Sequence, residues 1–282
     1  MRTCSVLLAM LASCYSPQAA PGAPCSKEGT CPGALVCLEG TCVPPGTLPA
    51  DAPPVPRDAP PEVPSPDGPT TNPPPDAYVD PSLVAYWELD DAPGNGALDS
   101  TGNGHTGTCA TACPTVVTGK LGNAYHFDAS LDQALTVPDS ADFRGTFTLA
   151  VWMYADATGS NMAMISKPEG TDTDNSWQLE LRDTSKLSFS GGSTHYLETP
   201  ATVAAGAWRH VAGTWDGTTK RLYVDGVLVA SVDSSITYDT HLVYIGADQN
   251  AGSTVLHWDG TLDDLRIYNR ALSATEIAAL AQ

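Results

Sequence analysis

The carboxylates that come nearest to a catalytic pair are Glu180 with Asp183, and Asp263 with Asp264. Paired carboxylates hydrolyse glycosidic bonds when one serves as the acid and the other, at a set distance, as nucleophile or base. Side chains alternate between the two faces of a strand, so groups an odd number of residues apart point to opposite sides. Both pairs have odd spacing. Neither therefore predicts a hydrolytic site.

Histidine and nucleophile patterns do not predict catalysis either. The six histidines are scattered, and no Ser or Cys lies near them in a nucleophile-elbow motif. They are His105, His126, His195, His210, His241 and His257. Isolated histidines are usually surface or packing residues. We predict that the protein is not an enzyme.

The eight cysteines indicate an exported protein. Cys4 lies in an N-terminal apolar run and Cys14 ends it. The remaining six, an even number as a fully disulfide-bonded exported protein requires, are Cys25, Cys31, Cys37, Cys42, Cys109 and Cys113. We expect a small loop disulfide between Cys109 and Cys113.

Residues 25–43 hold four of these cysteines in a segment too short to bury a core, so crosslinks must set its shape. Three pairings are possible. We favour Cys25–Cys37 with Cys31–Cys42, because pairing of neighbours would leave two unlinked loops. Zinc is the alternative, but the short two-residue gaps typical of zinc sites are absent.

The N-terminus has the pattern of an export signal. Arg2 precedes a short apolar run that ends in Leu11, Ala12, Ser13 and Cys14. The run is too short to span a bilayer, and its end resembles a bacterial lipobox. We predict a signal peptide at 1–13, lipid on Cys14 and a short tether at 14–24. The protein would then be exported and anchored to the cell envelope, at the outer membrane or cell surface. The alternative is an ordinary signal cleaved after Ala19 or Ala20.

Proline dominates residues 44–81, which contain fifteen of the 24 prolines in the chain. Such a segment has little to bury and favours an extended, disordered spacer. At about 3.1 Å per residue it would reach on the order of 100 Å when fully extended. We interpret it as a linker that holds the next domain away from a membrane.

Residues 82–282 predict one all-β domain. Their apolar residues alternate with period two in several segments, of which Thr146 to Tyr154 is the longest. Asp225 and Gly226 lie between two such segments and predict a type I′ hairpin turn. Ser273 and Glu276 form a capping box that predicts one short C-terminal helix. Many short strands without strand–helix alternation indicate an antiparallel sandwich.

Six segments of this domain resemble, in order, the LamG-like jelly-roll family of the concanavalin A-like lectin and glucanase superfamily. They are LVAYWELDD at 83–91, DSTGNG at 99–104, GKLGNA at 119–124, WRHVA at 208–212, LYVDG at 222–226 and GTLDDLRIYNRAL at 260–272. The resemblance implies a two-sheet jelly roll. It implies no chemistry, because this fold carries lectins, adhesion modules and hydrolases alike. The Glu-x-Asp-x-x-Glu signature of its glucanases is absent.

The resemblance also implies a structural calcium ion, held by Asp99, Asn103 and Asp263. A hard cation needs several oxygen ligands, which a glycine-rich loop beside carboxylates can supply. The alternative is that Asp99 and Asn103 stabilise a turn and that Asp263 ends a strand.

Charge narrows the choice of partner. The chain has a net charge of −19, so nucleic acid is not an expected partner. We expect a membrane-tethered binding module for a carbohydrate or matrix, or else an adhesion protein that docks another surface protein. Trp258, Asp259 and Tyr196 are the expected ligand contacts, whereas the tryptophans in alternating strands, Trp87, Trp152, Trp177, Trp208 and Trp215, are expected in the core.

Overall fold

The computed structural model describes residues 36–38, 41–43, 80–92, 96–110, 112–170, 174–192 and 196–282. The chain forms two compact units that divide after Asn72. In the first, β1 (Val36–Leu38) and β2 (Thr41–Val43) form a hairpin that contains Cys37 and Cys42. Cys42 is buried and disulfide-bonded. The predicted signal peptide, the lipid on Cys14, the tether, Cys25, Cys31 and the linker up to residue 79 lie outside the described residues.

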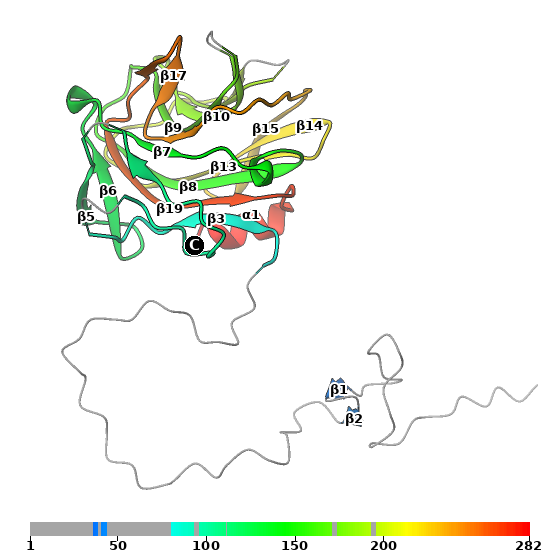
Figure 1. Cartoon of the computed structure of the whole chain (residues 1–282). Coiled ribbons are helices and arrows are strands. Elements are labelled where there is room, and N and C mark those ends of the chain that lie inside the picture. The colour runs from blue at the N-terminus through cyan, green and yellow to red at the C-terminus, as the bar shows by residue number, and fades with distance from the viewer. Residues whose placement is uncertain are drawn as a thin grey trace, which may run out of the picture. The chain divides into compact units, whose positions relative to one another are not determined.

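The second unit consists mainly of two antiparallel sheets (Figure 1). The eight-stranded sheet contains β3 (Leu83–Trp87), β5 (Thr115–Thr118), β6 (Asn123–Phe127), β8 (Phe147–Ala155), β13 (Arg209–Trp215), β14 (Thr219–Val224), β15 (Val227–Asp233) and β19 (Gly260–Tyr268). The seven-stranded sheet contains β4 (Thr108–Cys109), β7 (Leu135–Val137), β9 (Met162–Pro168), β10 (Asn175–Leu181), β11 (Leu187–Ser190), β12 (Tyr196–Glu198) and β16 (Val243–Ile245). A hairpin of β17 (Asp248–Asn250) and β18 (Ser253–Val255) and two 3-10 turns, η1 (Ala129–Leu131) and η2 (Ala141–Phe143), complete the strands and turns. The predicted all-β sandwich is confirmed.

Strand β19 organises the eight-stranded sheet. One edge pairs with β8, and the other is shared by β6, opposite its first residues, and β3, opposite its last. The strand order in the eight-stranded sheet is β15-β14-β13-β8-β19-β6-β5, with β3 paired to β19 outside this order. The strand order in the seven-stranded sheet is β12-β11-β10-β9-β16-β7-β4. Strands adjacent in space are therefore often far apart in sequence, as a jelly roll requires.

The core lies between the two sheets, where period-two alternation places the apolar side chains. Trp87 and Trp177 are fully buried in this core, and Trp215 is almost so, as predicted. Trp152 is also buried, but it alternates with the inward Val151 and Met153 and therefore lies on the outer face of the eight-stranded sheet, against His210 and under the Lys120 ammonium. Trp208 is only half-buried, because it lies just before β13 and packs on Tyr154, with ring centroids 5.7 Å apart.

Two local predictions are confirmed. Asp225 and Gly226 join β14 to β15 with φ of +48° and +78°, the left-handed conformations that a type I′ turn needs. Cys109 and Cys113 form a disulfide with Cα atoms 5.1 Å apart.

Helix α1 (Ala274–Leu280) begins at the predicted capping box of Ser273 and Glu276. It packs against the eight-stranded sheet through Ile277, which joins Ala150, Ala212 and Tyr223 in a second apolar cluster. Within the described part of the chain, no helix is long and apolar enough to cross a membrane.

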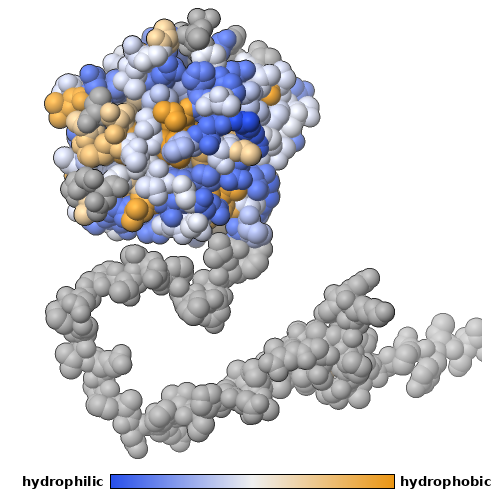
Figure 2. Space-filling model, in the orientation of Figure 1, coloured by the Kyte–Doolittle hydropathy of each residue, from blue (hydrophilic) through white to orange (hydrophobic). Residues whose placement is uncertain are grey.

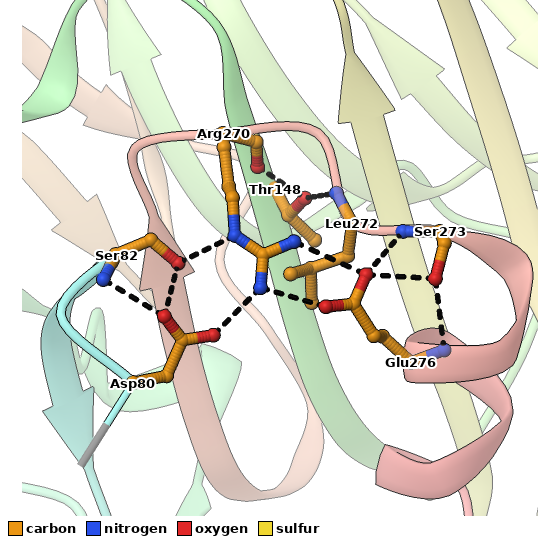
Figure 3. A network of polar contacts seen from close by, with 7 residues as sticks. All are labelled: Asp80, Ser82, Thr148, Arg270, Leu272, Ser273 and Glu276. Atoms are coloured by element: carbon orange, nitrogen blue, oxygen red, sulfur yellow. Dashed lines mark hydrogen bonds and ion pairs between the residues drawn. The ribbon is translucent and has the colours of Figure 1, made fainter. Parts of the chain in front are cut away.

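A polar network, which we call the Arg270 clasp, joins the start of the domain to α1 (Figure 3). The Arg270 guanidinium donates to Asp80 Oδ2 (2.7 Å), Ser82 Oγ (2.8 Å) and both oxygens of Glu276 (2.7 and 3.1 Å). The Arg270 carbonyl accepts from Thr148 Oγ1 (2.8 Å) on β8. The folded domain therefore includes Asp80, two residues before the predicted boundary at 82.

Candidate functional site

A pocket of about 770 Å³, which we call the polar pocket, lies on the outer face of the seven-stranded sheet. Strand β10 explains its position: Trp177, Leu179 and Leu181 point into the core, so Gln178 and Glu180 point to the opposite face. The pocket is lined by Asn161, Glu169, Gly170, Asp174, Asn175, Gln178, Glu180, Arg182, Ser190, Gly191, Gly192, Tyr196, Ser235, Thr237, Asp248, Asn250, Val255 and Leu256. Its lining thus combines β10 with residues of β11, β12, β17 and β18.

Hydrogen bonds hold the pocket amides in fixed orientations. Asn175 Nδ2 donates to Gln178 Oε1 and to Asp248 Oδ2, both at 3.1 Å. Ser190 Oγ also donates to Gln178 Oε1, at 3.2 Å. The side chains of Asn175, Gln178 and Asp248 cannot rotate without breaking these bonds, so the polar floor is preorganised.

Three polar atoms of this floor are buried without a hydrogen-bond partner. They are Asn175 Oδ1, Gln178 Nε2 and Asp248 Oδ1, on residues only 7%, 3% and 4% exposed. A buried polar group without a partner costs about 1–3 kcal/mol, so each such group needs an explanation. Two acceptors and one donor in a pocket match a ligand rich in hydroxyl groups.

The pocket is acidic. Burial raises the pKa of Glu180 and that of Asp248, each above its ordinary value, although hydrogen bonds partly oppose the rise. Arg182 Nη1 donates to Glu180 Oε1 at 3.4 Å, and its Nε lies 3.8 Å from Glu198 Oε1. The guanidinium also lies over the Tyr196 ring, 3.9 Å from its centroid. Arg182 therefore supports the aromatic ring at the pocket rim.

Of the predicted ligand contacts, Tyr196 alone lines this pocket, and it is 53% exposed. The prediction that Trp258 is an exposed stacking residue was wrong, because Trp258 is fully buried in the core. The physical reason is that Trp258 continues the inward alternation of Gly260 and Leu262. Asp259 is half-buried and does not line the pocket; its carbonyl accepts from Asp156 N at 3.1 Å.

The structure gives Asp99 a turn-stabilising role. Its Oδ1 accepts from Tyr86 N (3.2 Å), Thr101 N (3.0 Å) and Thr101 Oγ1 (2.7 Å), and its Oδ2 from His105 N (2.9 Å). Burial would raise the pKa of Asp99, but these bonds outweigh it and lower the pKa. The Asn103 amide donates to Val84 O at 3.0 Å. Asp99 thus uses both carboxylate oxygens, and Asn103 its amide nitrogen, in contacts within the protein, as the turn-stabilising alternative expects. A calcium ion that these residues share with Asp263 stays a prediction.

Asp263 has a different environment, in the middle of β19. Its Oδ2 accepts from Lys120 N (2.7 Å) and Leu121 N (2.9 Å), while its Oδ1 is buried without a partner. Burial raises the pKa of Asp263 to about 7, and the nearby carboxylates of Asp264 and Asp90 add to the rise. An orphaned, buried carboxylate oxygen fits a cation.

Asp90, just after β3, approaches the same loop. A Cβ at Gly119 would lie 2.6 Å from Asp263 Oδ2, and one at Gly122 would lie 2.8 Å from Asp90 Oδ1. Among the residues described, no group of three or more His, Cys, Asp or Glu side chains could hold a metal. Calcium here would draw its other oxygens from backbone and water.

Sequence reasoning missed Asn175, Gln178 and Asp248. The alternation of β10 could have placed Gln178 on the face opposite Trp177. Nothing local pointed to Asp248, which is 73 residues from Asn175 in the chain.

Two antiparallel sheets packed face to face define the class of antiparallel β-sandwiches. Residues 128–278, more than half of the chain, match the family model Laminin_G_3, described as the concanavalin A-like lectin/glucanases superfamily, and the chain belongs to this family. Comparison with curated proteins finds no match.

Solved structures share the fold at low sequence identity. The binding domain of Paraclostridial Mosquitocidal Protein 1 is 16% identical, with a TM-score of 0.58 over 71% of this chain and 52% of that chain. Domain 4 of AbnA, a GH43 extracellular arabinanase from Geobacillus stearothermophilus in complex with arabinotriose, is 21% identical, with a TM-score of 0.55 over 71% and 98%. Trypanosoma rangeli sialidase in complex with sialic acid is 18% identical, with a TM-score of 0.56 over 71% and 32%. This chain thus spans about half of the first structure and a third of the last.

Proposed function

We propose that the protein is a non-catalytic glycan-binding module and that the polar pocket is its sugar site. The observation that carries this proposal is the set of buried, unpartnered atoms Asn175 Oδ1, Gln178 Nε2 and Asp248 Oδ1. Sugar hydroxyls both donate and accept, so they match both the acceptors and the donor of this set. Tyr196 offers an exposed aromatic face for stacking at the rim.

The shape and polarity of the site favour a sugar over a docked protein. A protein partner is expected to bind a flat apolar patch, whereas this site is a hollow lined by amides and carboxylates. In the view of Figure 2 the surface is largely hydrophilic, and its apolar residues form small, separate patches.

Glycoside hydrolysis is the second candidate, because the pocket contains two buried carboxylates, those of Glu180 and Asp248. Asp183, the other member of the pair considered from sequence, is exposed beyond the end of β10 and does not line the pocket. Turnover of aryl glycosides that disappears in Glu180→Gln would establish hydrolysis and replace the binding function.

We also propose that the module is held at the cell envelope by lipid on Cys14 and is displayed by the proline-rich linker. A calcium ion at Asp263 and Asp90 would stabilise the domain without taking part in sugar binding. The unpartnered Asp263 Oδ1 supports the ion, and the lipobox pattern supports the anchor.

The test of sugar binding is a glycan array probed with the purified full chain, followed by calorimetry on the best glycan. Tyr196→Ala should weaken binding about tenfold, or about 1.4 kcal/mol, through loss of stacking. Tyr196→Phe keeps the ring and serves as the matched control. An array without bound glycans, or equal affinities for wild type and Tyr196→Ala, would overturn the assignment.

A further inference from the structure

We propose that the polar pocket selects saccharides by charge: it binds sugars that are neutral or carry an amino group, and it excludes sugars that carry a carboxylate. This inference rests on the proposed glycan-binding function and names the class of ligand.

The first argument is the balance of charge around the pocket. Glu169, Asp174, Glu180 and Asp248 line it, against one cation among its described lining residues, Arg182. That cation is engaged on both sides, by Glu180 at 3.4 Å and by Glu198 at 3.8 Å, and it lies over Tyr196. A ligand carboxylate would find no uncommitted positive group among these residues.

The second argument is the set of polar atoms that await a partner. Asn175 Oδ1 and Asp248 Oδ1 are acceptors and Gln178 Nε2 is a donor. A hydroxyl group can pair with either kind of atom, and an ammonium group, which only donates, can pair with the two acceptors. A carboxylate satisfies Gln178 Nε2 alone, and it would lie beside the carboxylate of Asp248 in a site shielded from solvent, where like charges repel strongly.

The orientation of these groups is fixed, so the pocket cannot adapt to an anion. Asn175 Nδ2 is held by Gln178 Oε1 and Asp248 Oδ2, and an amide flip that offered Nδ2 to a carboxylate would break both bonds. The field of the domain acts in the same direction. Residues 82–282 contain ten Lys and Arg against twenty-four Asp and Glu, a net charge of −14. This field slows the approach of acidic glycans and favours cationic ones.

The experiment uses the full chain and matched sets of glycans that share one core: the neutral oligosaccharide, its form with a free amino sugar, and its forms with a terminal sialic or uronic acid. The amino form should bind at least as tightly as the neutral form, and the acidic forms at least about tenfold more weakly, a difference of about 1.4 kcal/mol. Raising the salt should reduce the gap for groups near the rim.

Two variants assign the selectivity to the pocket. Asp248→Asn keeps the shape of the side chain and removes its charge, and Glu169→Gln does the same at the half-buried rim, where folding is less at risk. Each should narrow the ratio between neutral and acidic glycans. Asp183→Asn is the matched control, because it removes the same charge from an exposed residue outside the pocket lining, and it should leave the ratio unchanged.

The outcomes separate this inference from the function on which it rests. Binding of acidic glycans as tight as that of their neutral counterparts would overturn charge selection and leave the sugar site standing. Selectivity that Asp183→Asn changes as much as Glu169→Gln does would also overturn it, because net charge and not the pocket would be responsible. Binding of no glycan at all would overturn the glycan-binding function itself.

Discussion

The carboxylates of Asp99 and Asp263 differ in the number of hydrogen bonds that they accept, because their neighbours differ. Asp99 accepts four hydrogen bonds within its own loop and from β3, so both of its oxygens are occupied. Asp263 uses one oxygen for the loop at Lys120 and Leu121 and keeps the other buried and unpartnered. The family resemblance grouped the two residues as ligands of one ion, whereas their contacts separate them.

Replacement of Asp99 should destabilise the domain whether or not calcium is present. Asp99→Ala removes the acceptor for Tyr86 N, Thr101 N and His105 N and should cost about 2–3 kcal/mol of unfolding free energy. For a domain of this size that lowers the melting temperature by roughly 5–10 °C. The measurement is thermal unfolding in calcium and in chelator. A loss seen only in calcium would restore Asp99 as a ligand.

Replacement of Asp263 should abolish the response to calcium. If the folded domain alone binds the ion, stabilisation is roughly 2.7 kcal/mol at a hundredfold excess over Kd. Chelation should therefore lower the melting temperature of the wild type by several degrees and leave that of Asp263→Asn almost unchanged. Identical wild-type melting curves in calcium and in chelator would show that no calcium ion stabilises the domain. Asp156→Asn, at an exposed residue paired with His126, controls for charge.

Among the structural elements, helix α1 depends on ionic contacts as well as on its apolar side. It has seven residues, too few to be stable alone, so packing and the Arg270 clasp must hold it. The pKa of Glu276 is lowered to about 2, chiefly by hydrogen bonds from Arg270 and Ser273. A folded-state pKa below the unfolded one means that the contact stabilises at pH above about 4.5 and is lost as the pH falls toward 2.

We predict that acid releases α1 before the sandwich unfolds. Amide exchange of residues 274–280 should accelerate between pH 4.5 and pH 2 relative to β8 and β19, after correction for intrinsic rates. Arg270→Ala should give the same loss of protection at neutral pH, with about 1 kcal/mol lost overall, while Arg270→Lys should recover part of it. Unchanged protection of α1 in Arg270→Ala would show that packing of Ile277 is sufficient.

The β14–β15 turn also lies against helix α1. Gly226 has φ of +78°, and a Cβ there would lie 3.0 Å from Ala278 Cα of α1. Gly226→Ala should cost about 1–2 kcal/mol for the left-handed conformation, with a further loss from the contact. Gly252→Ala is the control, because its φ is +83° and nothing lies within 4 Å of the added methyl. If denaturant unfolding shows the same loss of unfolding free energy for Gly226→Ala and Gly252→Ala, α1 moves to accommodate the added methyl group.

For the whole molecule, the proposed anchor and linker would decide where the pocket operates. A lipid on Cys14 with a spacer of 38 residues would present the sandwich at a distance from the membrane. Cys14→Ser should transfer the protein from membranes to the soluble fraction, because several acyl chains on one terminus provide stable anchoring. Sugar affinity should not change, since the residues that line the pocket all belong to the second unit. Partition of Cys14→Ser into the detergent phase would contradict the lipid assignment.

Local sequence patterns were sufficient for several elements of this protein, including one of its longest strands, one hairpin turn and its helix. Period-two alternation predicted the strands, Asp225 and Gly226 predicted their turn, and Ser273 with Glu276 predicted α1, because each signal acts between residues a few positions apart. The Cys109–Cys113 disulfide was predictable for the same reason, because its two cysteines are only four residues apart. These features depend on backbone preferences and nearby side chains, and both are present in the chain before it folds.

The tertiary structure alone decided which polar groups meet. Asp248 reaches Asn175 across 73 residues of sequence, and Tyr196 reaches Arg182 from a different strand. Alternation along β10 placed Gln178 on the outer face of the sheet. Whether that face forms a pocket depends on residues in and next to β17 and β18, which complete its lining. Trp258 was misassigned for the same reason. Burial and hydrogen-bond partners are properties of packed neighbours, and a pattern of residue types along one strand does not contain them.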